Sequence, residues 1–595
     1  MDAQSRWTPW LALLLLVAAL VHLPVLDNDF SWDDRAAAMG RDGDWVRPEI
    51  LELQAPQAYF VQPYWPARQI GDDKLWRPVT VLSFALRHAV AGDDPRLAHA
   101  LNLALLLLGI VLAWRVLRAL GAPEPGPLIG ATIFALHAVH SEVVAGVVGR
   151  SELLGFCFGF GALLLFLRAL DREGRARLVA LAGCALSLFL AFASKESTLA
   201  FVVFIPLFAW ARKRLGRSPE AVATTPRRLA EGAALLLPAV AALSLRAVAL
   251  AGARGNPITW MENPLAGEPW TVRIPNALWT SLHAQWLTIA PFDLAADWGP
   301  ALHPVLTPAD PRWWIAVVAG LGWLAAIVWL VRRRRERPLW LLAAACWFGF
   351  FFVVSNVPFA VNLVMAERTL FVPSLALSLL ALPLVERLRR EPELRGVATI
   401  ALAAWLGASA ASARERCGIW HDNKTLIEHE VLARPDNVRM RICMAHLCAV
   451  DERWTEALHH LDRAVELAPD HGWSWHDRGW ILQELGRDQD AVECFRQAIA
   501  GRNDDPTWKL RAHCKLARSL FRLGRDREAL GQAAEALRIH RLVLDDEPDL
   551  AADLRARATG DDETLAAMAR KLLAVGAPAS DQTPAHPTPS GGPPR

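Results

Sequence analysis

Long apolar runs recur along the chain up to about residue 413 and then stop. A helix needs about 20 mostly apolar residues to cross the roughly 30 Å hydrocarbon core of a bilayer. The pattern predicts about eleven transmembrane helices, near residues 9–26, 97–120, 127–146, 151–170, 177–194, 197–211, 229–251, 313–331, 338–358, 368–386 and 396–413. Two further stretches, 79–91 and 276–291, could instead be re-entrant or interfacial helices.

The first apolar run is expected to stay in the mature fold as a signal anchor, because residues 21–26 offer no small-residue cleavage site. Basic residues set the predicted orientation, since Lys and Arg near helix ends resist translocation. With the N-terminus inside, the arginine clusters around 115–118, 168–177, 212–217, 332–337 and 387–390 all fall on the cytoplasmic side. An odd number of crossings then places everything after residue 413 outside the cytoplasm.

A repeat of 34 residues follows the membrane part. It is seen in five pairs: Trp420 and Trp454, Pro435 and Pro469, Ala457 and Ala491, Leu461 and Phe495, and Ala464 and Ala498. This is the tetratricopeptide period, in which two short helices form one unit. A third copy, with Gly524 where the second has Gly486, is displaced by four residues, which predicts a small insertion near Asp504.

These patterns predict an all-α chain of three parts. Residues 1–413 form a polytopic helical membrane domain, residues 414–573 a soluble tetratricopeptide α-solenoid, and residues 574–595 a Pro-rich disordered tail.

Composition agrees with a membrane protein, because 53% of the residues are hydrophobic and only 21% are charged. The net charge of +2 argues against a nucleic-acid partner. The eight cysteines include no CxxC pair, which argues against a zinc ribbon or a disulfide scaffold.

An acidic pair, Asp33 and Asp34, follows the first predicted crossing in a loop rich in aromatic residues. Neighbouring carboxylates in a partly apolar setting repel, so that one pKa rises while the other group stays ionised as a base. The alternative is a solvated acidic loop that only enforces orientation.

A second polar group, made of His137, His140, Glu142, Arg150 and Glu152, joins the third and fourth predicted crossings. The two histidines are three residues apart and would share a helix face. A metal site formed with Glu142 is one alternative, but the spacing is loose and no HExxH motif is present, which favours hydrogen-bonded structural histidines. A guanidinium at a helix mouth suits a phosphate, which makes Arg150 a candidate phosphate ligand.

Further charges lie at the predicted outer boundary. They are Arg77, the neighbours Lys195 and Glu196, and the neighbours Glu367 and Arg368. Each could be a structural ion pair that lets a charge lie near lipid. Together the cations would face the acidic pair, an arrangement that fits a phosphate-bearing lipid head and a hydroxyl deprotonated by a carboxylate.

The order of these motifs resembles the GT-C membrane glycosyltransferases, specifically the transmembrane and tetratricopeptide-repeat O-mannosyltransferases with their bacterial relatives. The resemblance lies in Asn28-Asp29-Phe30-Ser31-Trp32-Asp33-Asp34-Arg35, Trp76-Arg77-Pro78, His137-Ala138-Val139-His140-Ser141-Glu142, Val148-Gly149-Arg150-Ser151-Glu152, Ser194-Lys195-Glu196, Asn263-Pro264-Leu265-Ala266, Asp297-Trp298 and Ala366-Glu367-Arg368. Three places depart from the usual pattern: Ala138 stands for Pro, Glu152 for Asp, and Thr369-Leu370-Phe371 for Tyr-Leu-Tyr.

The resemblance implies transfer of a sugar, mannose or another hexose, from a polyprenyl-phosphate carrier to Ser or Thr hydroxyls of proteins on the non-cytoplasmic face. It implies Asp33 as general base with Asp34 as its neighbour or substitute. Arg77, Arg150, Lys195 and Arg368 are the implied ligands of the donor phosphate. His137, His140, Glu142, Glu152, Glu196 and Glu367 would shape the sugar and acceptor site. A divalent cation is compatible with this chemistry but not required.

Acceptor proteins recruited by the repeats and membrane lipid are the expected partners. Seven lysines against 56 arginines favour a GC-rich bacterial genome, hence an inner membrane with the loops and repeats in the periplasm. The alternative is a non-catalytic membrane-anchored scaffold that binds extracytoplasmic proteins. It does not explain so many crossings. A flippase is a third hypothesis, disfavoured because the charges gather at one face and not at the midplane.

Overall fold

The computed structural model describes residues 7–42, 45–65, 75–217, 225–251, 258–502, 506–540, 547–560 and 562–576. The chain forms two compact units, Met1–Asn437 and Val438–Arg595. Both are helical, and a two-stranded antiparallel ribbon, β1 (Arg41–Asp42) with β2 (Trp45–Val46), is the only sheet in the described ranges. Residues 577–595, most of the predicted tail, lie outside the described residues.

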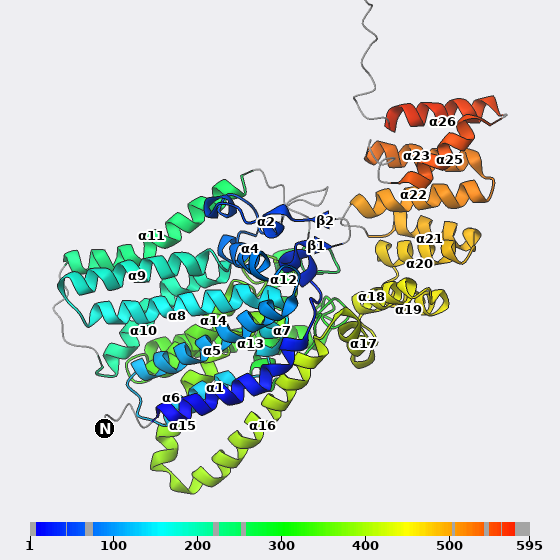
Figure 1. The fold of residues 1–595 in the computed structure, drawn as a ribbon. Helices are drawn as coiled ribbons and strands as arrows, with labels where there is room; N and C mark the ends of the chain where they lie inside the picture. The colour runs from blue at the N-terminus through cyan, green and yellow to red at the C-terminus, as the bar shows by residue number, and fades with distance from the viewer. Residues whose placement is uncertain are drawn as a thin grey trace, which may run out of the picture. The chain divides into compact units, whose positions relative to one another are not determined.

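The first unit is a bundle of long helices (Figure 1). Its main helices are α1 (Thr8–His22), α4 (Pro78–Ala91), α5 (Pro95–Ala119), α6 (Gly126–Ala135), α7 (His140–Ala145), α8 (Arg150–Leu170), α9 (Gly174–Phe192), α10 (Phe201–Arg214), α11 (Thr225–Ala249), α12 (Trp270–Ile289), α13 (Pro311–Arg332), α14 (Pro338–Phe352), α15 (Leu375–Arg390), α16 (Arg395–Ile419) and α17 (Asn423–Ala433). Two short helices, α2 (Pro48–Leu51) and α3 (Pro56–Tyr59), lie in the loop after α1.

Eight helical segments in the described ranges are long and apolar enough to cross a membrane, fewer than the eleven predicted. They are Thr8–Asp27, Pro95–Ala119, Val147–Leu170, Gly174–Phe192, Thr225–Ala249, Pro311–Arg332, Glu367–Arg390 and Pro392–Ile419. The other three predicted runs form the shorter helices α6, α10 and α14. With its many apolar helices, the chain is an integral membrane protein.

The predicted helix over 127–146 is wrong, because the chain turns between α6 and α7. Polar side chains satisfy the backbone at the break: the Ala138 N–H donates to Ser409 Oγ at 3.0 Å, and the Ser141 hydroxyl donates to the Ala138 carbonyl at 2.8 Å. His137 therefore lies in the turn and His140 begins α7, so the two do not share one helix.

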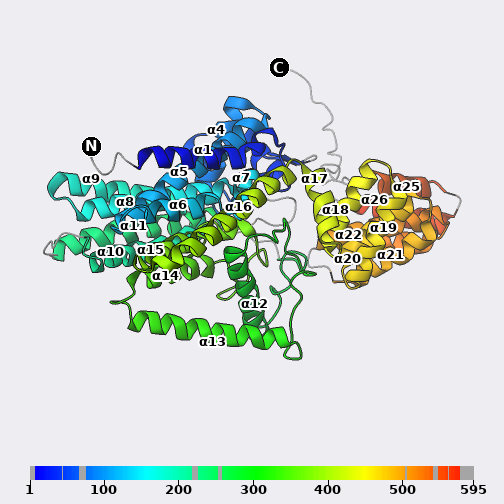
Figure 2. The ribbon, with the colours of Figure 1, turned by 90° about the horizontal axis from the view of Figure 1, so that it is seen from below.

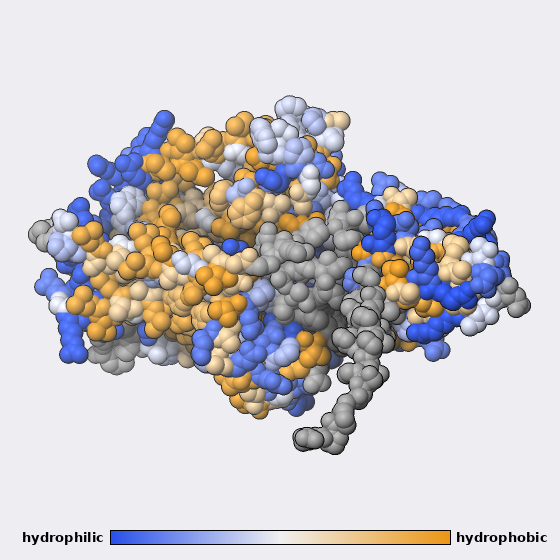
Figure 3. Space-filling model, turned by 90° about the horizontal axis from the view of Figure 1, so that it is seen from above, coloured by the Kyte–Doolittle hydropathy of each residue, from blue (hydrophilic) through white to orange (hydrophobic). Residues whose placement is uncertain are grey.

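Apolar side chains cover the outside of the first unit, as expected where lipid replaces water. Helix α13 shows this best: within it only Ala316 is buried, while Trp314, Val318, Leu321 and Leu324 are all more than half exposed. Figure 3 shows hydrophobic side chains spread widely over this unit on the face drawn. Such a surface is stable in hydrocarbon and would aggregate in water.

Charged residues mark the end of the bundle at which α1 begins, the end that carries the N mark in Figure 2. Arg212 pairs with Asp171 at 2.8 Å and Arg177 with Glu231 at 2.9 Å, which joins the ends of α8, α9, α10 and α11. The Arg389 guanidinium donates to the Glu124 carbonyl and so joins α15 to the start of α6. Contacts of this kind bring the arginine clusters around 115–118, 168–177, 212–217 and 387–390 to one end of the bundle.

The second unit stacks helix pairs. They are α18 (Val438–Val450) with α19 (Trp454–Leu467), α20 (Gly472–Glu484) with α21 (Asp488–Ala500), α22 (Pro506–Arg522) with α23 (Asp526–Ile539), and α25 (Pro548–Ala558) with α26 (Glu563–Gly576). Small and aromatic residues predicted from the repeat, Ala491, Ala498 and Phe495, are buried between them.

The third repeat differs by a longer helix. Helix α22 has 17 residues, whereas α20, its counterpart in the second repeat, has 13. The four extra residues of α22 account for the shift of Gly524 by four positions relative to the 34-residue period. The predicted insertion point near Asp504 lies outside the described residues. Gly486 and Gly524 both have φ of +71° at the turn after the first helix of their pair, a conformation that glycine adopts without strain.

Candidate functional site

The end of the bundle opposite the arginine clusters carries most of the predicted site residues. Four contacts assemble it: the Asp29 N–H donates to the His421 carbonyl, the Val79 N–H to the Ala193 carbonyl, Lys195 pairs with Glu152, and Arg368 with Glu142. The first contact joins the loop after α1 to the segment after α16, and the second joins α4 to the end of α9. The two ion pairs join the segment after α9 to α8 and the segment before α15 to α7. Segments distant in sequence therefore meet at this end of the bundle.

The two acidic residues of the first loop have different surroundings. Asp34 is fully buried, and its carboxylate accepts hydrogen bonds from the Val148 N–H at 2.8 Å and the Ser31 N–H at 3.4 Å. Gly149 keeps that turn tight, since a Cβ there would lie 2.3 Å from the Val143 carbonyl oxygen. Asp34 thus fastens the loop to the start of α8, and its carboxylate is more deeply buried than that of Asp33.

Burial raises the pKa of Asp34 to about 7, although hydrogen bonds from the backbone of Val147, Val148 and Ser31 oppose the shift. A carboxyl group whose folded-state pKa is raised binds its proton more tightly when folded, so the stability it contributes at low pH is lost as the pH rises toward 7. We expect the Tm of the wild type, relative to that of Asp34→Asn, to fall by about 5 °C between pH 5 and pH 8. Thermal unfolding in detergent at several pH values measures this, and two parallel curves would contradict it.

Asp33 is only partly buried. Across the part of the chain that the structure describes, its carboxylate has no hydrogen-bond partner. It interacts electrostatically with Arg368 and with Tyr64. Its backbone is unusual, because Trp32 just before it has φ of +52° and Arg35–Met39 just after it form a turn of π-helix. Both features are found often at functional sites.

Three cations gather at this end of the bundle, and each pairs with a glutamate. Arg77 Nε lies 3.0 Å from Glu196 Oε2, and Lys195 Nζ lies 2.8 Å from Glu152 Oε1. The Arg368 guanidinium lies 2.7 Å from Glu142 Oε1. The first two pairs also affect each other's charge: burial would raise the pKa of Glu196, but Arg77 and Lys195 hold it below its usual value.

Glu152 connects the pairs, because its charge acts on Arg77 and Arg368 as well as on Lys195. The Tyr64 ring, which the sequence did not suggest, lies 4.9 Å below the Arg77 guanidinium. We call Asp33, Arg77, Glu142, Glu152, Lys195, Glu196 and Arg368 the charged cluster. In it the Asp33 carboxylate, which has no hydrogen-bond partner among the described residues, lies in the field of Arg368, and Glu152 links Arg368 to the other two cations.

Arg150 has a different environment from the one predicted. It is 1% exposed, and each of its three nitrogens donates to the protein: Nε to Asn102 Oδ1 at 2.9 Å, and the other two to the carbonyls of Ser83 and Ala98. The Phe84 ring lies below it. With its donors engaged this way, Arg150 joins α4, α5 and α8 and is not available to a phosphate in this structure.

His137 and His140 are also buried among protein groups. His137 Nε2 lies 2.8 Å from the Thr288 carbonyl and His140 Nε2 lies 2.9 Å from Ser374 Oγ. The His140 ring packs between Phe134 and Phe371, at 4.5 and 4.6 Å between ring centres. Neither faces the charged cluster, so the predicted contact of these rings with sugar or acceptor has no support in the geometry.

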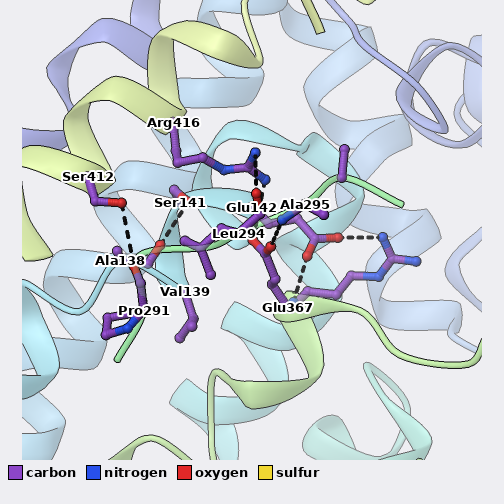
Figure 4. A network of polar contacts seen from close by, with 12 residues as sticks. Ala138, Val139, Ser141, Glu142, Pro291, Leu294, Ala295, Glu367, Ser412 and Arg416 are labelled. Carbon is purple, nitrogen blue, oxygen red and sulfur yellow. Dashed lines mark hydrogen bonds and ion pairs between the residues drawn. The ribbon is translucent and has the colours of Figure 1, made fainter. Parts of the chain in front are cut away.

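Glu367 belongs to a second network, although it is next to Arg368 (Figure 4). Its carboxylate accepts the Ala295 N–H and pairs with Arg416 at 3.3 Å. Arg416 also pairs with Glu430 of α17 at 3.2 Å. Sequence analysis missed Arg416 and Glu430 because the last apolar run was ended at residue 413. An arginine one helical turn before the end of an apolar helix was the available signal.

No group of three or more His, Cys, Asp or Glu side chains that could hold a metal ion is found among the described residues.

Comparison with known proteins adds two findings. Family models described as tetratricopeptide repeat match residues 437–504 and 514–549. The chain is 23% identical over 507 residues to Mus musculus Protein O-mannosyl-transferase TMTC3, covering 82% of this chain and 54% of that protein. It is 24% identical to the Homo sapiens protein of that name (74% and 50% covered) and 25% identical to the Drosophila melanogaster one (79% and 56% covered).

The chain is a distant homologue of the TMTC protein O-mannosyl-transferases. The similarity runs over most of its length and includes both the membrane part and the repeats. The chain spans about half the length of the curated relatives it matches. The family resemblance inferred from the motifs, the all-helical fold and the tetratricopeptide repeats are thereby confirmed.

Proposed function

We propose that this protein is a membrane glycosyltransferase that moves a hexose, such as mannose, from a polyprenyl-phosphate carrier to Ser or Thr hydroxyls of other proteins. The observation that carries the proposal is the Asp33 carboxylate, which has no hydrogen-bond partner among the described residues and lies in the field of Arg368. The cations Arg77 and Lys195 are linked to Arg368 through the charge of Glu152. The distant homology to protein O-mannosyl-transferases supports the same reaction class.

In the proposed reaction, Asp33 takes the proton of the acceptor hydroxyl, whose oxygen then bonds to the anomeric carbon of the sugar. The bond from that carbon to the phosphate oxygen breaks, and the phosphate leaves with the electron pair. Arg368 and its neighbours would stabilise the negative charge that develops on the phosphate. A hydroxyl is a poor nucleophile until a base removes its proton. The Asp33 carboxylate would therefore act on the attacking hydroxyl, while the cations act on the departing phosphate.

A transfer assay tests this proposal. Membranes containing the protein are supplied with radiolabelled undecaprenyl-phosphate mannose and an extract of secreted proteins, and label bound to protein is released by alkaline β-elimination and counted. We expect label on Ser or Thr that depends on the protein. If a panel of lipid-linked hexoses gives no protein-bound label, the transferase proposal fails and a binding scaffold remains.

We further propose that the charged cluster and the repeats face the periplasm of a bacterial inner membrane. The last helix of the first unit, α17, lies at the same bundle end as Asp33, since the Trp32 N–H donates to Asn423 at 2.5 Å. Single cysteines in place of Asp27, Arg335 and Glu493, all exposed, test the arrangement. In intact spheroplasts an impermeant maleimide should label positions 27 and 493, and position 335 only after lysis. Labelling of 27 and 493 from opposite sides would overturn the orientation.

A further inference from the structure

The loop that carries Asp33 is held by the segment between α16 and α17. The Asn28 side-chain amide donates to the carbonyls of Cys417 at 3.0 Å and Trp420 at 3.1 Å, and the Asp29 N–H donates to the His421 carbonyl at 2.8 Å. Asn28 is only 2% exposed, so these bonds are protected from water. The first loop therefore depends on a segment almost 400 residues further along the chain.

A further contact between the same two segments lies next to Asp33. The Trp32 N–H donates to the side-chain oxygen of Asn423 at 2.5 Å. Trp32 has φ of +52°, a left-handed conformation that a bulky residue rarely adopts. A residue held in such a conformation persists only where its surroundings hold it there. The side chain of Asn423 supplies one such constraint.

Asn423 is free for this contact because another residue caps its helix. Asp422 Oδ1 accepts the Thr425 N–H at 2.7 Å and so satisfies the start of α17. A backbone N–H can only donate, hence the atom of Asn423 that faces Trp32 must be its oxygen. A residue that keeps an oxygen there can take over the contact, whereas alanine cannot.

We propose that Asn423 is a positioning residue for Asp33. It fixes the backbone just before Asp33, while Asp34 fixes the backbone just after it through the Val148 N–H. The Asp33 carboxylate, which has no hydrogen-bond partner among the described residues, is thus held from both sides by neighbours that are themselves anchored. This inference rests on the proposed role of Asp33 as general base.

The test compares Asn423→Ala, Asn423→Asp and the neighbouring control Lys424→Ala, whose side chain is exposed. Each full-length variant is assayed for transfer of mannose from undecaprenyl-phosphate mannose, with kcat and donor KM determined separately. Asn423→Ala should lower kcat about tenfold with little change in donor KM, because it displaces the base and not the phosphate ligands. Asn423→Asp should keep most of the activity, and Lys424→Ala all of it.

Three results would overturn the inference: a normal kcat in Asn423→Ala, an equal loss in the Ala and Asp variants, or a loss that appears in donor KM alone. Elution as a single peak in detergent and a wild-type donor KM show that a slow variant is folded. Asp33→Asn is assayed alongside. If Asp33→Asn is inactive and Asn423→Ala is normal, only the positioning role is lost. If Asp33→Asn is fully active, the proposed base is wrong and the positioning role fails with it.

Discussion

Asp33→Asn is expected to lower kcat for sugar transfer by about a hundredfold or more. A positioned general base contributes about 10² to 10⁴ in rate, and an amide cannot take a proton from a hydroxyl. The substitution keeps size and shape, and no hydrogen bond of the described structure ends on the Asp33 carboxylate, so little stability should be lost. Single-turnover transfer from undecaprenyl-phosphate mannose measures the chemical step.

Asp27→Asn is the matched control. Asp27 is exposed in the same loop, and its substitution removes the same negative charge. It should leave kcat within about twofold. A double variant in which Asp33 and Asp34 are both Asn and which transfers sugar at the wild-type rate would contradict catalysis by this loop altogether.

Arg368→Ala should have the second largest effect, a fall in kcat of about a hundredfold. Removing one preorganised donor to a developing negative charge typically costs a factor of about 10² to 10³. The Arg368 side chain is 22% exposed, unlike its partner Glu142, which is 3% exposed. Arg368→Lys should recover part of the rate, since a lysine keeps the charge but not the planar pair of donors.

Two controls separate this effect from a loss of folding. Arg387→Ala changes an exposed arginine at the other end of α15 and should be silent. Glu142→Gln keeps most of the shape but weakens the ion pair, and it should retain more activity than Arg368→Ala. If Glu142→Gln were as slow as Arg368→Ala, the pair would matter as a structural unit and Arg368 would not act on phosphate by itself.

Much of the fold was predictable because apolar length and the 34-residue period are local properties of the sequence. Every predicted apolar run contains a helix, and the corresponding glycines of the repeats, Gly486 and Gly524, lie at the same turn of their helix pairs. What local pattern could not show was where a run breaks. The turn after α6 depends on Ser409, which is distant in the chain, so the run over 127–146 read as one helix.

The same limit applies to the site. Residue type identified Asp33, Lys195 and Arg368 as candidates, and the structure places them close together. Residue type alone could not separate Arg368 from Arg150, since both are arginines at helix mouths. Burial and acceptors decide between them: Arg150 is enclosed by Asn102 and two carbonyls, whereas Arg368 keeps an exposed edge. No sequence pattern marked Tyr64 or Asn423 as a candidate, because the contacts of Tyr64 with Arg77 and of Asn423 with Trp32 exist only in the folded chain.

The one-to-one pairing of cations with glutamates has a consequence for turnover. In the proposed reaction, an anionic headgroup entering the charged cluster meets three cations that each already hold a glutamate, so it would have to replace one of these carboxylates. The displaced glutamate would stay tethered nearby and compete for the same cation once the sugar has left. This competition would weaken binding of the spent carrier and favour its departure, and the ion pair would re-form at the end of each cycle.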